Sequence, residues 1–310
     1  MRANDILDAI GNTRLVGIPR MSPKPSVRLW AKLEGDNPTG SLKDRIAKRM
    51  IEAAEESGEL TPDRIILEAT SGNTGISLAM VARRKGYRLT VVMPDNASEE
   101  RIRLLELFGA EIVFSPGDKG TNGSIEVARA MAKDEKYLLT FQYGNQANPQ
   151  AHYEGTGAEI VRDLPEVTHF VAGLGTGGTL MGCGRRLREH NPDVKIIAAE
   201  PELGELVYGL RSLEEGFVPP ILDESMLDRK FLVDSSDALR ATRALVEREG
   251  VFAGISSGAV LHVANRIAQD LDEGDVVCLL ADGGWKYLST NAWAEELERA
   301  EKGVEETLWW

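Results

Sequence analysis

Short apolar runs alternate with amphipathic segments along most of the 310-residue chain. The runs contain many β-branched residues and are apolar along most of their length, as expected of strands that are buried on both faces. The predicted strands are 27–34, 64–70, 88–95, 111–116, 137–143, 168–175, 195–203 and 275–284. Between them lie segments with helical periodicity, at 75–86, 98–110 and 124–135. This alternation predicts an α/β fold, and the number of strands favours two open, mostly parallel, helix-covered sheets over one sheet.

A polar segment separates the two predicted α/β units. Residues 144–152 are rich in turn-forming residues and have no strand pattern, so we place the seam there. In open α/β sheets, ligands bind at the carboxyl ends of the strands. The loops that follow strands are therefore the first place to look for chemistry.

The composition is that of a soluble globular protein in a reducing compartment. Hydrophobic residues make up 42% of the chain and charged residues 27%, and the net charge of -13 disfavours binding to nucleic acids or anionic membranes. Cys183 and Cys278 lie far apart, and the N-terminus has no signal-peptide run, which indicates a cytoplasmic protein. The four histidines form no zinc-binding pattern, so we expect no metal.

Three loops rich in glycine and hydroxyl groups precede predicted helices. They are EATSGNTGIS (68–77), GLGTGGT (173–179) and GISSGAV (254–260). Free backbone N–H groups at a helix N-terminus bind carboxylates and phosphates. The alternative for each loop is a polar turn that only caps its helix, and one of Ser256 and Ser257 is expected to do so. The second loop also fits the G-x-G-x-x-G pattern of NAD-binding folds, with Glu200 near the expected acidic position.

A lysine stands among turn-forming residues in NPTGSLKDR (37–45), at the predicted start of a helix. A cation is poorly placed there, because the helix dipole already gives that end a partial positive charge. In the simplest interpretation, Ser41 and Asp44 form a capping box and Lys43 points into water. The other loops, however, suit a ligand with a phosphate and an amine-reactive group. Pyridoxal phosphate, held as a Schiff base on a lysine, has both.

Four motifs in this order and spacing resemble the cysteine synthase family, which are fold-type II pyridoxal-phosphate enzymes: NPTGSLKDR, TSGNTG, GTGGT and GISSGA. The segments AIGNTRLV, VMPDNASEER and YLST also match, so that the resemblance covers nearly the whole chain. It implies pyridoxal 5'-phosphate as the cofactor and a homodimer. It also implies a smaller, mobile domain at 38–145, which carries the Schiff-base lysine and the substrate loop. A larger domain at 1–37 and 146–310 would carry the phosphate cradle.

The resemblance implies a role for each matched residue. Lys43 would form the Schiff base and act as the general base, Asn73 would bind the ring hydroxyl and Ser256 would face the pyridine nitrogen. The phosphate cradle would consist of Gly175, Thr176, Gly177, Gly178 and Thr179. The substrate carboxylate would be bound by Thr70, Ser71, Thr74 and Gln142. The implied reaction is β-replacement: an O-activated serine loses its β-substituent to give an aminoacrylate, and a sulfur nucleophile adds to form L-cysteine.

One segment resembles the O-phosphoserine sulfhydrylase branch, which includes cysteine synthase B. VYGLRSLEEGFVP (207–219) places Arg211 where the side chain of the activated serine approaches. A guanidinium can donate two parallel hydrogen bonds to a phosphate, and the alternative is a solvated arginine on an acidic loop. In this branch the sulfur donor can be the thiocarboxylated C-terminus of a ubiquitin-like carrier protein. The LWW ending also matches, and we expect the tail to dock at the mouth of the active site, unless it packs on the body of the protein or on a dimer partner.

Three other functions are consistent with parts of the sequence. The same cofactor and fold could serve an O-acetylserine sulfhydrylase, a cystathionine-forming synthase or a serine/threonine dehydratase. An NAD-dependent oxidoreductase would explain GLGTGGT but would leave TSGNTG and Lys43 unexplained. A metabolite-binding protein with a decayed site is disfavoured, because the motif set is complete.

Overall fold

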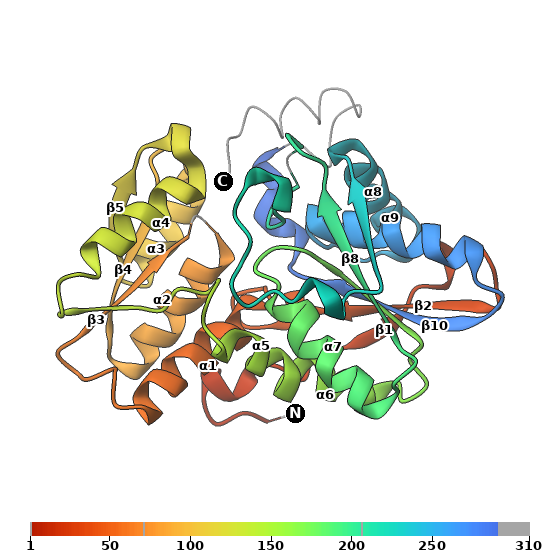
Figure 1. Ribbon diagram of the computed structural model, residues 1–310, viewed down its shortest axis with the longest axis horizontal. Coiled ribbons are helices and arrows are strands. Elements are labelled where there is room, and N and C mark those ends of the chain that lie inside the picture. Colours follow the sequence, from red (N-terminus) through yellow and green to blue (C-terminus); the bar gives the residue numbers. More distant parts are fainter. Residues whose placement is uncertain (1, 71, 206, 291–310) are drawn as a thin grey trace.

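The computed structural model describes residues 2–70, 72–205 and 207–290. These residues form two sheets, each covered by helices, that lie next to one another (Figure 1). The strands are β1 (Leu15–Gly17), β2 (Val27–Leu33), β3 (Ile65–Ala69), β4 (Arg88–Pro94), β5 (Glu111–Ser115), β6 (Tyr137–Leu139), β7 (His169–Gly173), β8 (Lys195–Pro201), β9 (Arg229–Val233) and β10 (Gly274–Leu280). The helices are α1 (Lys43–Glu56), α2 (Asn73–Lys85), α3 (Glu99–Leu107), α4 (Gly120–Met131), α5 (Ala147–Ala151), α6 (Ala158–Asp163), α7 (Gly178–His190), α8 (Ser235–Glu249) and α9 (Ile255–Asp270).

The smaller sheet has the strand order β5-β4-β3-β6 and is parallel throughout. Successive residues of its strands face opposite sides. Ile66 and Val91 pack with α1, α2 and α3, whereas Leu67 and Val92 pack with α4. Both faces are therefore buried, which explains why these strands are apolar along their whole length in the sequence.

The larger sheet has the order β1-β2-β10-β7-β8-β9, in which all pairs are parallel except β1 with β2. One face packs on α8 and α9 through residues such as Leu29 and Val171. The other face packs on α6 and α7 through residues such as Phe170 and Val277. The fold class predicted from the sequence is confirmed.

Two differences from the predicted strands have local causes. The segment expected at 137–143 ends as a strand at Leu139, because Phe141 has a φ of 46° and the hydroxyl of Thr140 bonds the carbonyl oxygen of Leu67. The pattern also missed β1 and β9. Both are short edge strands with partly exposed residues.

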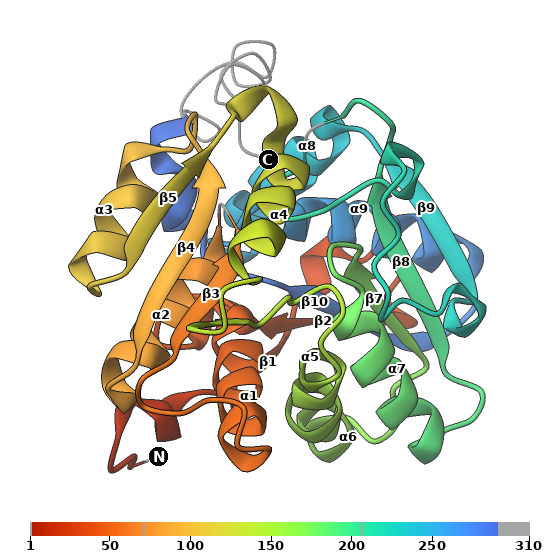
Figure 2. The ribbon, with the colours of Figure 1, turned by 60° about the vertical axis from the view of Figure 1, so that its left-hand side comes forward.

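The predicted seam, 144–152, lies where the two halves meet. It contains α5, which packs on α1 from one side and on α7 from the other (Figure 2). Every strand of the smaller sheet lies within 65–139, but the domain boundaries at 38 and 145 stay a prediction. Among the described residues, no helix has both the length and the apolar character needed to cross a bilayer.

Candidate active site

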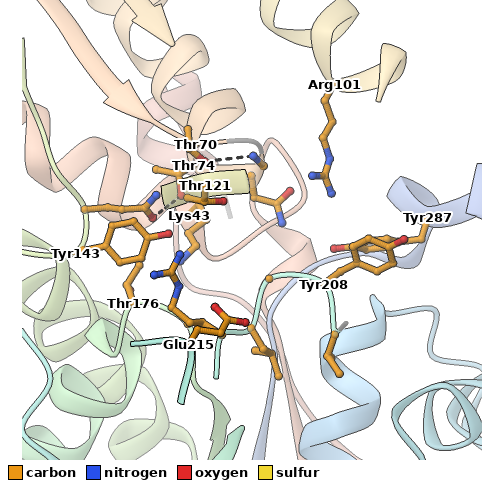
Figure 3. Close-up of a pocket in the computed structure, with 18 residues that line it drawn as sticks. Lys43, Thr70, Thr74, Arg101, Thr121, Tyr143, Thr176, Tyr208, Glu215 and Tyr287 are labelled. Atoms are coloured by element: carbon orange, nitrogen blue, oxygen red, sulfur yellow. Dashed lines mark hydrogen bonds between the residues drawn. The ribbon is translucent and has the colours of Figure 1, made fainter. Parts of the chain in front are cut away.

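Two adjoining cavities lie between the sheets, at the carboxyl ends of their central strands. Both are lined by Lys43, Asn73 and Thr176. The first extends to the loop after β3 and to the segment after β8, and the second to the N-termini of α7 and α9. Figure 3 shows the side chains around the first cavity, with Lys43 at its centre. The structure thus brings the loops singled out in the sequence to one place.

Lys43 is the first residue of α1, and its side chain points into the cavities rather than into water. Burial lowers the pKa of its amine to about 8, although the carboxylates of Asp282 and Glu68 oppose the shift. The backbone N–H of Lys43 donates to the hydroxyl of Ser41 over 3.3 Å. A pKa close to neutrality makes the free amine accessible, which a nucleophile or general base requires.

The capping box expected from Ser41 and Asp44 does not form. The carboxylate of Asp44 instead accepts bonds from the N–H and hydroxyl of Thr39 and from the hydroxyl of Ser77. Asp44 is buried, and it joins the turn before α1 to the middle of α2. Its role is to fix the turn that precedes Lys43.

Asn73 begins α2 and contacts two residues that the sequence analysis did not identify. Its amide nitrogen donates to Asp282 over 2.7 Å, and its amide oxygen accepts from the amine of Lys286 over 2.6 Å. The hydroxyl of Tyr287 also donates to the carboxylate of Asp282, at 2.7 Å. Asp282 follows β10, so its position after a strand was a signal that could have found it.

The loop 175–179 precedes α7 and forms a cradle with almost no side-chain volume. Gly177 has a φ of 84°, which favours glycine. A Cβ on Gly178 would lie 1.9 Å from the amide oxygen of Asn148, and one on Gly175 would lie 2.8 Å from the carbonyl oxygen of Gly209. Thr176 lines both cavities, and Gly177 and Thr179 line the second. Backbone N–H groups, two hydroxyls and a helix N-terminus are the features of a phosphate site.

Ser256 lines the second cavity together with Lys43 and Thr179, and Ser257 does not. No side chain caps α9, whose N-cap is Gly254, so the expectation that one serine caps this helix is wrong. The predicted ring-facing residue therefore lies in the same cavity as the phosphate loop. Its hydroxyl is a neutral group, which can bond a ring nitrogen without forcing it to be protonated.

Three of the four residues predicted to bind a substrate carboxylate line the first cavity. They are Thr70, Thr74 and Gln142, and the hydroxyl of Thr74 donates to the side-chain oxygen of Gln142 over 2.8 Å. The fourth, Ser71, lies outside the described residues. The C-terminal tail expected at the mouth of the site also lies outside them.

Glu68 lies beneath these residues and was missed in the sequence. It is fully buried, and one of its oxygens accepts from the hydroxyl of Thr140 at 2.7 Å and from the backbone N–H of Gln142 at 3.1 Å. Burial raises the pKa of its carboxyl group to about 7, and these hydrogen bonds oppose the shift. Glu68 thus fixes the backbone at Gln142.

Arg211 is buried and lines the first cavity, so it is not a solvated arginine. Its guanidinium lies 5.2 Å from the ring centroid of Tyr143 and 4.8 Å from that of Phe217. It also donates to the side-chain oxygen of Asn122 over 3.2 Å. Two aromatic rings and a hydrogen bond hold the cation in one orientation, facing the space around Lys43.

Several other residues that line the first cavity were not found from the sequence. Arg101, Thr121, Tyr143 and Glu215 all line the same cavity, as Figure 3 shows. Burial raises the pKa of Glu215, and the charge of Arg211 opposes that shift. These residues come from α3, α4 and loops without a recognisable motif, so only the folded chain identifies them.

The structure does not support the dinucleotide-binding interpretation of GLGTGGT, because Glu200 does not lie where a ribose would bind. The carboxylate of Glu200 accepts the N–H of Leu213 over 2.6 Å and pairs with the amine of Lys230 at 2.9 Å. It is fully buried and lines neither cavity. Glu200 therefore holds the segment that carries Arg211 and does not face a ribose. Among the described residues, no group of three or more histidine, cysteine, aspartate or glutamate side chains could hold a metal ion.

Comparisons with known proteins identify the family and the fold of the chain. Residues 6–283 match the family model described as pyridoxal-phosphate dependent enzyme. The chain is 42% identical over 294 residues to cysteine synthase B of Salmonella typhimurium, which covers 94% of this chain and 97% of that protein. A crystal structure of cysteine synthase from Entamoeba histolytica superposes with a TM-score of 0.90 at 32% identity, covering 98% of this chain and 96% of the other. A crystal structure of O-ureido-L-serine synthase superposes with a TM-score of 0.89 at 40% identity, covering 94% and 95%.

Proposed function

The chain belongs to the family of pyridoxal-phosphate dependent enzymes and is a cysteine synthase, and from this premise we propose that its amino-acid substrate is O-phospho-L-serine. The observation that carries the proposal is Arg211. This buried, oriented cation lies in the same cavity as Lys43 and as the residues proposed to bind the substrate carboxylate. A planar guanidinium matches a phosphate dianion better than it matches a neutral acetyl ester.

The residues around Lys43 fit the cofactor. Lys43 would hold it covalently, Ser256 would face its ring nitrogen, and the loop 175–179 would hold its phosphate. The close approaches to Asn148 and to the backbone of Gly209 leave no room for a side chain at Gly178 or Gly175, so the backbone of the loop packs directly on its neighbours. When bound, pyridoxal phosphate supplies an electron sink that lets the α-proton and the β-substituent of the substrate depart.

The side chains of the protein perform the proton transfer and the positioning. In our proposal the amine of Lys43, with its lowered pKa, takes the α-proton and later returns it. Thr70, Thr74 and Gln142 bind the substrate carboxylate and fix the direction of the β-substituent. With the carboxylate held there, the phosphate of the substrate reaches Arg211, whose charge stabilises the phosphate as it leaves.

We propose that Asn73 binds the ring hydroxyl of the cofactor, as its family position implies. Its contacts with Asp282 and Lys286 fix the orientation of its amide. Because Asp282 can only accept, the amide nitrogen of Asn73 must face that carboxylate.

The sulfur donor and the assembly complete the proposal. Sulfide or the thiocarboxylated C-terminus of a small carrier protein would supply the sulfur, the C-terminal tail would shield the site, and the enzyme would act as a cytoplasmic homodimer. These features rest on the family resemblance and on the LWW ending. O-ureido-L-serine synthase, at 40% identity, and the O-acetylserine enzymes are the second candidates, because a related site can accept other activated serines or nucleophiles.

The test compares substrates in the wild type and in Arg211→Ala. We expect the substitution to lower kcat/KM for O-phosphoserine by about 100-fold, which corresponds to about 2.7 kcal/mol of transition-state stabilisation. For O-acetylserine the change should stay within about threefold, because a neutral ester makes no charge-assisted bond. Arg211→Lys, which keeps the charge but loses the planar fork, should give an intermediate value.

Arg101→Ala is the matched control, since it removes the other guanidinium that lines the cavity. A wild type that prefers O-acetylserine would refute the proposal. So would a phosphoserine preference that survives Arg211→Ala and disappears in Arg101→Ala.

A further inference from the structure

One segment, the predicted seam at 144–152, contacts the hydroxyls of both threonines of the loop 175–179. The amide nitrogen of Asn148 donates to the hydroxyl oxygen of Thr176 over 3.0 Å. The ring Nε2 of His152 lies 3.2 Å from the hydroxyl oxygen of Thr179. Asn148 and His152 are fully buried and touch the loop on the side away from the cavities.

The orientation of Asn148 follows from its second partner. Its amide nitrogen also donates to the backbone carbonyl oxygen of Gln142 over 2.9 Å. A carbonyl can only accept, so the nitrogen and not the oxygen must face both partners. The hydroxyl oxygen of Thr176 therefore accepts from Asn148, and the hydroxyl proton of Thr176 is left to point elsewhere.

The ring of His152 is held at both nitrogens. Nδ1 lies 3.0 Å from the hydroxyl oxygen of Thr156, which is also fully buried. Burial, together with the charges of Arg45 and Lys43, keeps the pKa of His152 well below its ordinary value, so the ring is neutral and carries one N–H. That proton sits on either Nδ1 or Nε2.

The two tautomers have opposite consequences for Thr179. With the proton on Nδ1, the hydroxyl of Thr179 must donate to Nε2, and its proton is then used. With the proton on Nε2, Thr179 accepts from the ring, Thr156 donates to Nδ1, and the proton of Thr179 is free to point into the cavity. A phosphate group only accepts hydrogen bonds, so it requires the second arrangement.

The backbone conformation at His152 is one that is common at functional sites. Residues His152–Gly157 form one turn of π-helix between α5 and α6, a rare conformation that is frequent at functional sites. This turn packs on α7, where a Cβ on Gly182 would lie 2.8 Å from the Cβ of His152. The π-turn thus brings the imidazole against the first turn of α7, beside Thr179.

We propose that Asn148 and His152 are positioning residues that make the hydroxyls of Thr176 and Thr179 hydrogen-bond donors toward the cofactor phosphate. The inference rests on the proposed function of the loop 175–179 as a phosphate cradle. It adds a layer of residues that never touches the cofactor. Because Asn148 also bonds Gln142, it links the phosphate loop to the site of the substrate carboxylate.

The experiment replaces one nitrogen of His152 at a time. In His152→Gln, the side-chain amide nitrogen can occupy the place of Nε2 and donate to Thr179, whereas the amide of His152→Asn reaches only the place of Nδ1. Apo-enzyme is titrated with pyridoxal phosphate and, separately, with pyridoxal, which lacks the phosphate. Binding is followed by the absorption band that appears when either compound bonds covalently to Lys43. This measurement needs no catalytic turnover.

We expect His152→Asn to weaken pyridoxal phosphate binding about tenfold, the effect of about 1.4 kcal/mol, and to leave pyridoxal binding nearly unchanged. His152→Gln should bind both compounds almost as the wild type does. Asn148→Asp, which cannot donate, should lose affinity for pyridoxal phosphate alone.

Three results would overturn the inference. They are equal losses for the two compounds, a loss in His152→Gln as large as that in His152→Asn, and an unchanged affinity in Asn148→Asp. Failure of the cradle itself would look different, since the wild type would then bind pyridoxal phosphate no more tightly than pyridoxal.

Discussion

Replacing Arg45 should destabilise the protein more than replacing any surface arginine does, because the guanidinium of Arg45 is buried between two carboxylates. Its Nε and Nη2 donate to both oxygens of Glu34 at 2.6 and 2.8 Å, and its Nη1 and Nη2 donate to both oxygens of Glu159 at 2.6 and 2.8 Å. Lys32, which is fully buried, donates to Glu159 over 2.7 Å. The cluster holds two positive and two negative charges and is balanced.

The change Arg45→Met keeps most of the volume and removes the four hydrogen bonds to carboxylates, together with one to the hydroxyl of Thr13 at 3.2 Å. It leaves two carboxylates and one ammonium, so that one negative charge is uncompensated in the interior. Removing one partner of a buried ion pair costs about 3–5 kcal/mol, and we expect a loss of that size in the free energy of unfolding at pH 8. Proton uptake relieves the extra charge, so the loss should shrink as the pH falls.

The assay is urea unfolding of the cofactor-free protein, with the midpoint and the slope measured for each variant. Arg14→Ala is the matched control, because Arg14 makes the same forked pair with Asp36 at 2.7 and 2.6 Å but its side chain is 72% exposed. Its loss should stay below about 1 kcal/mol. The double variant Arg45→Met/Glu34→Gln restores the charge balance and should recover at least half of the loss. A loss in Arg45→Met no larger than that in Arg14→Ala, or no recovery in the double variant, would contradict this expectation.

Three further predictions concern Lys43, Glu68 and the two cysteines. Lys43→Ala should lose the absorption band at roughly 410 nm that covalent cofactor binding gives, whereas Lys48→Ala on the same helix should keep it. A band retained in Lys43→Ala would exclude Lys43 as the residue that binds the cofactor covalently. Glu68 has a folded-state pKa of about 7, above its ordinary 4.5, so its burial costs stability as the pH rises between these values. Relative to the wild type, Glu68→Gln should therefore gain about 3 kcal/mol of unfolding free energy between about pH 4 and pH 8, and a pH-independent difference in urea unfolding would contradict this. Burial raises the pKa of Cys278 to about 12 and raises that of Cys183 as well, so neither thiol should react with a thiol reagent until the chain is unfolded; rapid labelling of the native protein would refute this.

The fold and the loops of the site were predictable because they depend on patterns that are local in the sequence. Buried parallel strands are apolar throughout, and the glycines of 175–179 leave the backbone space that a ligand needs. The edge strand β1 was missed because it has only three residues, and the edge strand β9 because it begins with two charged residues, Arg229 and Lys230.

The missed residues of the site act through contacts that are distant in the sequence. Glu68 reaches Thr140 and Gln142, more than 70 positions away, and Asp282 reaches Asn73 across 209 positions. The position of Asp282 after β10 was a signal, but no local pattern distinguishes a buried carboxylate with such partners from any other carboxylate near a strand end. The capping box failed for a related reason, since Thr39 and Ser77 offered Asp44 three donors.

The contacts across the cavities suggest how substrate recognition and cofactor binding are connected. Arg211, on the loop after β8, bonds Asn122 at the start of α4, so the proposed phosphate site already joins the two halves of the molecule. Asn148 bonds both Thr176 and Gln142, and therefore touches the proposed sites of the cofactor phosphate and of the substrate carboxylate. A phosphoserine held at both ends would draw on residues of both sheets. Its phosphate would replace Asn122 as the partner of Arg211. A substrate whose leaving group carries two negative charges would compensate for the hydrogen bond lost to Asn122, and a neutral one would not. Discrimination between activated serines would then depend on the charge of the leaving group more than on its size.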